Sequence, residues 1–450
     1  MGKLISHNLR LSEGILMKKK LSKIVGATLV SLLIGSTMAY ATPQSKPNGP
    51  YIENEQNISL SSLMTNQQLY DTLTKIAARS NGKMKLEIAG YSNANPINLM
   101  EEKGYPLYVV KFGDADPAKK RVMITSQIHG NEPIGTEAAV DLMQKLASGG
   151  KEVDDILSQV SIWFMPRINP DGAANTYEGN PYPTRYTHQT WSPEDIGLAT
   201  GTKPPWYYNP VGSERAQNNN GTVVYGIPGY DENRDFNPNL DLRIENIDST
   251  VVQTALNDRS TNRSTKGGFF VTPEARIVTK VFQELKPDVY FDLHHRGFNT
   301  VSDTDNRSVI IQVAAVVSTG TYKDDFSGKT LTVSPATLEL GKQVNVLGYQ
   351  SLQRGTSDFG AIQKYPNVDL PGTSLGAFNL NGAAIMLIEI KGQTQSLGQK
   401  ERGKLVQTVK EPVYAVFKAL ADGSISDIDA DLYDQIPVSA NGIGDPSTRD

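Results

Sequence analysis

Runs of apolar residues with the length of a strand recur along the chain. The clearest of these runs span Val122–Ser126, Val160–Met165, Val289–Leu293 and Ala384–Ile390. Nearly every position in each run is apolar, which is typical of strands buried on both faces, as in a parallel sheet. Two weaker strand candidates precede the first run, at Met84–Ala89 and Leu107–Phe112.

Other segments show the 3.6-residue spacing of amphipathic helices. The segments with this spacing are Ser61–Ser80, Gly135–Ala147, Pro273–Leu285 and Lys404–Ala421. Pro412 lies inside the last of them and should disturb that helix. Because apolar strands alternate with helices, the pattern predicts an α/β fold with a largely parallel sheet covered by helices on both faces.

Two regions do not follow this alternation. Residues 173–230 show little periodicity, repeated Pro and Gly, and many aromatic residues. A loop this long inside a compact domain is usually functional, so we interpret it as an insertion that forms the rim or lid of a cleft. The segment 423–450 is polar and predicts a loosely held tail. These limits leave one domain at 61–422, preceded by a flexible lead-in at 42–60.

The N-terminus has the pattern of a secretory signal peptide. A basic segment, Met17–Lys20, is followed by the apolar stretch Ile24–Met38 and the small residues around Ala41. This pattern predicts a start at Met17 and cleavage after Ala41, so that residues 1–41 would be removed from the exported protein. The alternative is an uncleaved anchor, but the apolar stretch is short for a membrane span.

Composition and charge narrow the possible functions. The chain has 450 residues and no cysteine, which excludes disulfides and thiolate chemistry. Residues 1–41 hold six of the 44 basic residues and one of the 48 acidic residues, so the mature chain would carry a net charge of −9. An acidic chain without basic clusters argues against nucleic-acid binding. We expect a soluble enzyme or binding protein, periplasmic or secreted, without stable membrane insertion after cleavage.

Three of the five histidines stand at the ends of two apolar runs. His129 and Glu132 follow the first run, and the pair His294-His295 follows the third. Two ring nitrogens and one carboxylate oxygen make a zinc site with an open fourth position, which is the catalytic arrangement. Each residue alone also has an ordinary structural explanation, as a bonded turn histidine or a helix-start acid. Asp292 is interpreted as a supporting group, on the argument that strand alternation turns neighbouring side chains apart.

Two further motifs lie at strand ends. Asn169-Pro170-Asp171-Gly172 follows the second run, and Glu389 lies near the end of the last one. A carboxylate in an apolar strand is costly unless it is paired or functional. Glu389 is therefore either an ion-pair partner, for example of Lys391, or a general base. In open α/β sheets, groups at the carboxyl ends of strands converge on one crevice.

The segment Asp231–Asn237 is the remaining polar cluster. An arginine fork pairs well with a carboxylate, so Arg234 could hold the terminal carboxylate of a peptide, with a further hydrogen bond from Asn233. The alternative is a solvated acidic loop with an internal Arg–Asp pair. The segment alone does not distinguish these possibilities.

Taken together, these motifs resemble those of the zinc metallocarboxypeptidases of the carboxypeptidase A type. The resemblance covers about residues 60–420. It depends on five motifs in the family's order, which are His129-x-x-Glu132, Asn169-Pro170-Asp171-Gly172, Asn233-Arg234-Asp235, Asp292-Leu293-His294 and Glu389-Ile390-Lys391. It implies a mixed, mainly parallel eight-stranded sheet between helices.

The resemblance also implies roles for individual residues. His129, Glu132 and His294 match the ligands of one Zn²⁺ ion, whereas His295 does not. Glu389 matches the family's general base. Asn233 and Arg234 match the pair that binds the terminal carboxylate of a peptide substrate.

Three positions depart from the family's pattern or obscure it. The arginine that polarises the scissile carbonyl could be Arg185 or Arg215. The spacing to Asp231 favours Arg215, which we predict for this role, whereas the spacing from Asp171 fits Arg185 better. Tyr365 is the nearest candidate for the family's tyrosine, without a firm match. The side-chain specificity pocket should involve the segment Leu370–Leu380, where the candidates are Ser374, Gly376 and Phe378.

These motifs are compatible with three functions. The first is hydrolysis of the C-terminal peptide bond of peptides by activated water and a glutamate base. The second keeps this chemistry but acts on cell-wall stem peptides or small acyl conjugates, for which aromatic side chains in the insertion would supply contact area. The third is a non-catalytic peptide-binding module that has kept the fold.

Overall fold

The computed structural model describes residues 63–438, apart from gaps at 178, 211–215, 218–222, 225–226, 259–264, 297–300, 303, 305–308, 316–319, 354–360, 366–369 and 392–397. All described residues fall within one compact unit, Pro47–Asp450. The predicted signal region, the lead-in at 42–60 and Arg215 lie outside the described residues.

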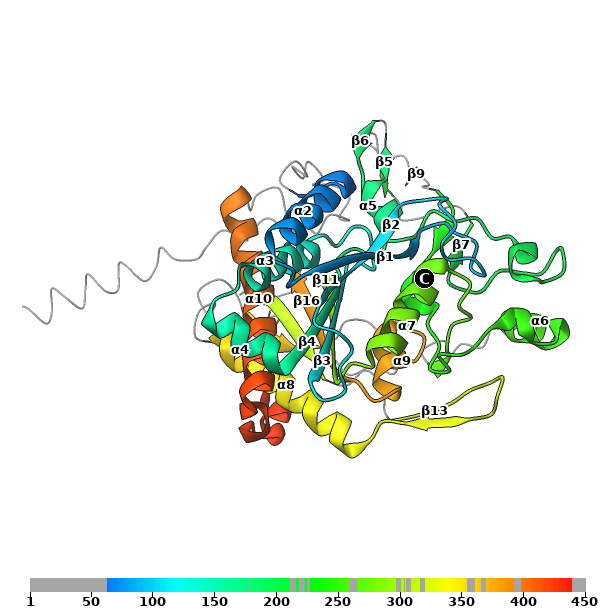
Figure 1. The fold of residues 1–450 in the computed structure, drawn as a ribbon. Helices are drawn as coiled ribbons and strands as arrows, with labels where there is room; N and C mark the ends of the chain where they lie inside the picture. The colour runs from blue at the N-terminus through cyan, green and yellow to red at the C-terminus, as the bar shows by residue number, and fades with distance from the viewer. Residues whose placement is uncertain are drawn as a thin grey trace, which may run out of the picture. The chain divides into compact units, whose positions relative to one another are not determined.

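Eight strands form one mixed sheet in the order β1-β2-β4-β3-β11-β16-β12-β15 (Figure 1). The strands are β1 (Lys85–Tyr91), β2 (Pro106–Phe112), β3 (Lys120–Ser126), β4 (Val160–Met165), β11 (Val289–Arg296), β12 (Val309–Ala314), β15 (Ala361–Lys364) and β16 (Ala384–Lys391). The central strands β4, β3, β11 and β16 pair in parallel, whereas β1, β2 and β12 introduce antiparallel pairs. The carboxyl ends of the four central strands therefore meet at one edge.

Helices cover both faces of this sheet, as predicted (Figure 1). One apolar core joins the sheet to α2 (Asn66–Arg79), α3 (Ile134–Ser148), α4 (Lys151–Gln159), α8 (Pro335–Gln353) and α10 (Gly398–Asp422). A second core lies on the other face, with α6 (Ser249–Asn257), α7 (Pro273–Leu285) and α9 (Ser374–Leu380). Helix α10 continues through Pro412.

Alternation along β11 explains how one strand serves both cores. Val289, Phe291 and Leu293 belong to the first core, whereas Tyr290 belongs to the second. Asp292 and His294 share the face of Tyr290, because side chains two positions apart point the same way. The strand therefore delivers its polar residues to the α7 and α9 side of the sheet.

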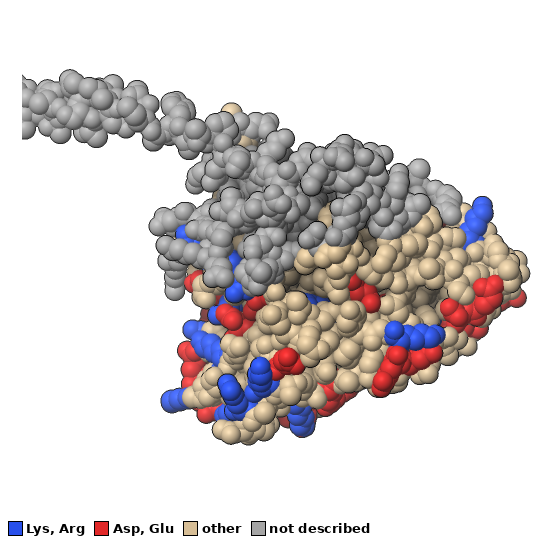
Figure 2. Space-filling view, turned by 90° about the horizontal axis from the view of Figure 1, so that it is seen from above, with Lys and Arg blue, Asp and Glu red and all other residues tan. Residues whose placement is uncertain are grey.

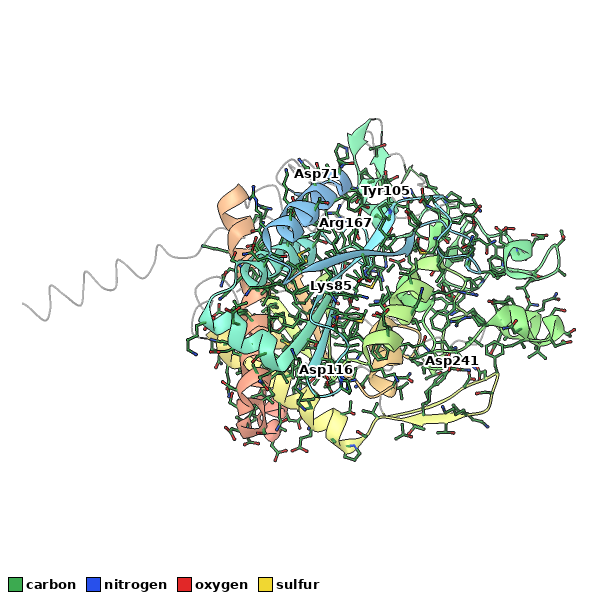
Figure 3. All side chains as sticks on the ribbon, in the orientation of Figure 1. Asp71, Lys85, Tyr105, Asp116, Arg167 and Asp241 are labelled. Atoms are coloured by element: carbon green, nitrogen blue, oxygen red, sulfur yellow. The ribbon has the colours of Figure 1, made fainter. Side chains whose placement is uncertain are left out.

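Helix α2 is fixed at its start by a capping box and by a buried arginine. The Thr65 side chain accepts a hydrogen bond from Gln68 N, and the Gln68 side chain accepts one from Thr65 N. Arg167 lies close to this helix (Figure 3) and donates to Asn66 Oδ1 and to the Met64 carbonyl. Helix α2 is thereby bound to the loop that follows β4.

The insertion contains short elements and contributes to the second core. Its short elements include the pairs β5 (Thr176–Tyr177) with β6 (Asn180–Pro181), β8 (Ala216–Gln217) with β9 (Val223–Val224), and β7 (Tyr208–Asn209) with β10 (Gly229–Tyr230), together with η3 (Pro193–Ile196). Ile196, Leu198, Tyr207 and Tyr230 are buried in the second core. The insertion is therefore built into the domain along part of its length.

The region beyond α10 is packed as far as residue 438, so the prediction of a loosely held tail is wrong for this stretch. It forms η8 (Ser424–Asp427) and η9 (Ala430–Gln435), and Tyr433 and Ile436 are buried in the first core. The Ala315 amide donates to the Tyr433 hydroxyl over 3.0 Å. The sequence pattern missed these anchors because they are few and surrounded by polar residues. Further elements of the described chain are α5 (Pro170–Ala174), η4 (Glu232–Arg234), η5 (Ile244–Asn246) and the hairpin of β13 (Thr321–Lys323) and β14 (Thr330–Thr332).

The described part of one face shows mixed charge (Figure 2). Figure 2 shows acidic and basic side chains interspersed over the described part of one face. Among the described residues, no helix is long and apolar enough to cross a membrane.

Candidate metal centre and substrate site

His129, Glu132 and His294 come together at the carboxyl ends of β3 and β11. Glu132 Oε1 lies 2.9 Å from His129 Nδ1, and Glu132 Oε2 lies 3.0 Å from His294 Nδ1. One donor atom from each residue lies within 4.8 Å of the others, and all three side chains are buried. Two atoms bound at about 2.1 Å to one tetrahedral zinc ion lie about 3.4 Å apart, so these donors fit a zinc ion after small shifts.

A carboxylate holds the outer nitrogen of each histidine. His129 Nε2 lies 3.3 Å from Asp231 Oδ1, and His294 Nε2 lies 2.9 Å from Asp292 Oδ2. Metal-binding histidines usually donate their other ring N–H to such a group, which fixes the ring and the tautomer. Asp292 is thus a supporting group, as interpreted, but the reasoning was wrong because Asp292 and His294 share a face of β11.

The electrostatics of this cluster suit a cation. Burial acts to raise the pKa of Glu132, but His129 and His294 outweigh it and hold the pKa well below its usual range. Burial acts to lower the pKa of His294, but Asp292 and Glu132 raise it well above its usual range. The carboxylates therefore draw positive charge into the cluster, which is the position a divalent cation would take.

His295 has a structural role and does not join this cluster. Its Nε2 accepts a hydrogen bond from the Ile134 amide over 2.8 Å. Burial lowers the pKa of His295 to about 4, so the ring is neutral. Its backbone amide donates to Glu132 Oε2 over 3.0 Å and thus helps to orient that carboxylate.

Tight turns place His129 and Glu132 beside the Asn-Pro-Asp-Gly motif. The Asn169 amide donates to the Gln127 carbonyl, and Gln127 adopts a positive φ of 53°. A Cβ atom on Gly130 would come within 2.3 Å of the Gly172 carbonyl carbon, so this close approach requires glycine. Asn169 Nδ2 also donates to the Arg185 carbonyl over 3.0 Å. The motif therefore positions both the metal-site turn and Arg185.

Arg185 reaches the metal cluster from the insertion. Its guanidinium donates to Asp231 Oδ2 through Nε at 3.0 Å and through one terminal nitrogen at 2.9 Å. The other terminal nitrogen lies 3.2 Å from His129 Nδ1 and 3.8 Å from Glu132 Oε1. Arg185 therefore lies in this site, whereas Arg215 lies outside the described residues. Spacing to Asp231 favoured Arg215, but spacing measured from Asp171 pointed to Arg185.

Glu389 stands beside His294 on the neighbouring parallel strand. The two residues are register partners in the pairing of β11 with β16. Burial raises the pKa of Glu389 to about 7, with opposing effects from His294 and Glu132. Its Oε2 atom is buried and has no hydrogen-bond partner among the described residues. A carboxyl group with a raised pKa and one buried oxygen without a partner, next to the metal ligands, suits proton transfer.

The turn that carries Asn233 and Arg234 is buried, so the alternative of a solvated acidic loop is wrong. Residues 232–234 form the 3-10 turn η4 (Glu232–Arg234), and Asn233 is only 5 % exposed. Asn233 Oδ1 accepts a hydrogen bond from the Ser374 amide over 3.1 Å, and its Nδ2 lies 3.5 Å from His294 Nε2. Asp235 is fully buried and accepts from the amides of Val271 and Thr272.

Arg234, the last residue of this turn, interacts electrostatically with Tyr365. Burial lowers the pKa of Arg234, whereas Asp231 and, more weakly, Tyr365 act to raise it. The Tyr365 amide donates to the Val313 carbonyl at the end of β12. Tyr365 therefore lies beside the end of β12 and near enough to Arg234 for its phenol to affect the Arg234 pKa.

The candidates for a specificity pocket divide into different roles. Ser374 Oγ donates to Asp292 Oδ2 over 2.8 Å, so it connects the Asn233 turn to the histidine support. Phe378 stacks on Phe282 at 3.9 Å and belongs to the second core. A Cβ on Gly376 would meet the Leu370 carbonyl oxygen at 2.1 Å. Phe378 and Gly376 therefore serve packing.

A zinc carboxypeptidase family profile matches residues 69–301 of this chain. The chain belongs to the zinc carboxypeptidase family. The match contains His129, Glu132, Asn233, Arg234 and His294 and ends before Glu389. The family that the five motifs resembled is therefore confirmed.

Curated relatives within this family match over short stretches. Carboxypeptidase E of Caenorhabditis elegans is 32% identical over 147 residues, which is 31% of this chain and 24% of the relative. Carboxypeptidase B of Astacus astacus is 33% identical over 75 residues, which is 17% of this chain and 25% of the relative. The aligned stretches span about a quarter of the length of these two relatives.

Two solved structures share the fold of this chain. The structure of carboxypeptidase A from Helicoverpa armigera is 14% identical, covers 90% of this chain and 86% of its own, and has a TM-score of 0.50. The structure of thrombin-activatable fibrinolysis inhibitor is 13% identical, covers 82% of this chain and 79% of its own, and has a TM-score of 0.50. The mixed eight-stranded sheet predicted for the family is confirmed.

Proposed function

We propose that this protein is an exported zinc-dependent carboxypeptidase that hydrolyses the C-terminal peptide bond of peptides. The proposal depends on three features that lie together, which are the metal donors, Glu389, and the turn of Asn233 and Arg234. Buried metal donors from β3 and β11 lie beside Glu389, and the buried turn of Asn233 and Arg234 lies next to them. The signal-like N-terminus supports export.

His129, Glu132 and His294 would hold one zinc ion, with Asp231 and Asp292 orienting the two histidine rings. When bound, zinc supplies a Lewis acid that polarises the scissile carbonyl and lowers the pKa of water. Glu389 would remove a proton from the attacking water and pass it to the leaving amine. Its raised pKa of about 7 suits both steps near neutral pH.

The remaining residues bind the substrate and its developing charge. Arg234 would pair with the terminal carboxylate, and Asn233, held by Ser374, would add a hydrogen bond. Arg185, fixed by Asp231, would face the carbonyl oxygen as negative charge grows on it. In this assignment Arg185 takes the role that spacing gave to Arg215.

A direct test is to follow peptide cleavage by mass spectrometry. The zinc-loaded protein should remove single residues from the carboxyl end of a peptide library, and a chelator should stop this release. Peptides with an amidated carboxyl end should resist cleavage, because Arg234 then has no carboxylate to bind. Internal cleavage, or equal cleavage of amidated peptides, would contradict the proposal.

The same assay separates the related functions. Muropeptides and N-acyl amino acids should be tested beside the peptide library. Cleavage of either one without release from ordinary peptides would move the assignment to cell-wall or conjugate substrates. Binding of peptides without cleavage of any substrate would support the non-catalytic module.

A further inference from the structure

Three buried carboxyl groups lie behind the turn that carries Asn233 and Arg234. They belong to Glu232 in η4, Glu274 at the start of α7, and Asp171 in α5 (Pro170–Ala174). Glu232 is 1 % exposed, Glu274 is fully buried, and Asp171 is 9 % exposed. The proposed zinc binding, proton transfer and substrate binding involve none of these three carboxyl groups.

These groups have few partners. Neither carboxyl oxygen of Glu232, nor Oδ2 of Asp171, has a hydrogen-bond partner among the described residues. Glu274 accepts from the Asn93 amide at 3.3 Å and from Gln189 Nε2 at 2.7 and 2.9 Å. Within the described part of the chain, no Lys, Arg or His forms an ion pair with any of the three.

The charged groups around Glu232 are mostly acidic. Those that act on it most strongly are Glu274 from α7, Asp171 from α5, and its neighbours Asp231 and Asp235. The nearby Arg185 is bound to Asp231. His188, on the loop beside Gln189, is neutral because burial lowers its pKa to about 4.

An isolated carboxylate without a counter-ion is costly to bury, so such a group takes a proton instead. Burial, followed by repulsion from Glu274, raises the pKa of Glu232 well above its usual range. Burial and then Asp171 raise the pKa of Glu274 to about 8. The folded protein therefore favours the neutral acid form of Glu232 and of Glu274, and Glu274 becomes charged as the pH rises through about 8.

The place of Glu232 in the chain connects this group to the substrate site. Its neighbour Asp231 holds Arg185 and His129, and its other neighbour, Asn233, bonds to Ser374. Asp235 is fixed by Tyr207 and Thr272 on the far side of the turn. A charge on Glu232 would be repelled by Glu274 and Asp171, and the short turn between these anchors would have to move.

We propose that Glu232 is a positioning residue. Its neutral acid form lets the η4 turn pack against α5 and α7. Its ionisation displaces Asn233 and Arg234 and thereby weakens binding of the substrate carboxylate. This inference rests on the proposed function of the Asn233–Arg234 pair. Glu232 touches no substrate in this account and acts through its neighbours.

The test measures KM and kcat separately between pH 6.5 and 9.5. In the zinc-loaded wild type, KM should rise on the alkaline side of this range, by up to about tenfold per pH unit, because binding then requires Glu232 to be protonated. Glu232→Gln, which is neutral and of the same size, should keep KM nearly constant over this range. Glu284→Gln, at an exposed glutamate of α7, is the matched control and should keep the wild-type rise.

A binding measurement separates this inference from the proposed function. The probe is 3-phenylpropanoate, which cannot be hydrolysed and carries a constant charge over this pH range. Its Kd, measured by calorimetry, should rise at alkaline pH in the wild type and in Glu284→Gln and should stay nearly constant in Glu232→Gln. This result is expected even if no peptide is cleaved. If Kd changes in this way and no peptide is cleaved, the proposed peptidase function is wrong and the inference about Glu232 still holds.

Several outcomes would overturn the inference. One is a wild-type KM and Kd that do not change with pH, and another is the same alkaline rise in Glu232→Gln as in the wild type. If Glu232→Gln does not fold, Glu274→Gln replaces it, and the rise should then move to lower pH, because loss of the repelling carboxyl group lowers the pKa of Glu232. An unmoved rise in that variant would also contradict the inference.

Discussion

Asp231 lies 3.3 Å from the outer nitrogen of His129 and at the same time binds the Arg185 guanidinium. One carboxylate thus supports both a metal ligand and the arginine proposed to stabilise negative charge. The insertion, which supplies Arg185, and the end of β3, which leads to His129, are joined through this single side chain.

Replacing Asp231 with Asn should therefore weaken the metal site. The amide keeps the size of the side chain but loses the charge that orients His129, so zinc affinity should fall by about 10- to 100-fold. Competition with a chelator of known affinity measures this change. Asp241→Asn, at an exposed aspartate, is the control and should bind zinc like the wild type. Unchanged affinity in Asp231→Asn would contradict the role of Asp231.

Arg185 and Arg215 can be distinguished by substitution. Arg185→Gln should lower kcat by about 10²- to 10³-fold, because the developing charge loses a preorganised donor. Arg215→Gln should leave kcat close to that of the wild type. Steady-state kinetics on one good peptide substrate measures both. A large loss in Arg215→Gln with little loss in Arg185→Gln would reverse the assignment.

Phe378 should matter for stability rather than for substrate choice. Its ring stacks on Phe282 at 3.9 Å and packs edge-on against Tyr290 at 4.9 Å. Phe378→Ala should lower the free energy of unfolding by about 3–5 kcal/mol, since it leaves a cavity in the second core. Denaturant unfolding measures this loss. A changed preference for the released residue with unchanged stability would return Phe378 to the specificity pocket.

Glu274 should make the protein less stable in alkaline solution. Burial raises its folded-state pKa from 4.5 to about 8, so the folded state binds the extra proton. The stabilisation linked to this proton is complete below about pH 4.5 and is lost as the pH rises to about 8. Glu274→Gln should therefore have a higher Tm than the wild type at pH 9 but not at pH 4.5. Thermal scans at the two pH values test this, and a Tm difference that is the same at both would contradict it.

The sequence predicted the buried centre of the fold because apolar patterning is strong there. The four apolar runs became β3, β4, β11 and β16, and the segment Pro273–Leu285 became α7 with the same limits. Weakly patterned elements were missed. Helix α8 contains Gly341 and Gly348, which allow close packing against Ala315 and Met386 but interrupt the apolar spacing.

The site could be predicted only where motifs are compact. His129 with Glu132, and Asn233 with Arg234, are short motifs at the ends of elements. Metal binding and carboxylate binding could therefore be inferred for them from the sequence. Arg185 lies in an aperiodic insertion, where spacing alone could not rank it against Arg215. The group of Glu232, Glu274 and Asp171 depends on contacts between η4, α7 and α5, which no local pattern reveals.

The most direct test of the whole account is a comparison of Glu389→Gln with the wild type. Both proteins should bind one zinc ion per chain, measured by metal analysis after dialysis, because Glu389 supplies none of the three donors. Release of the C-terminal residue should fall by at least about 10²-fold in the variant, since it has no base to move the proton. Stoichiometric zinc with full activity in Glu389→Gln would contradict the account.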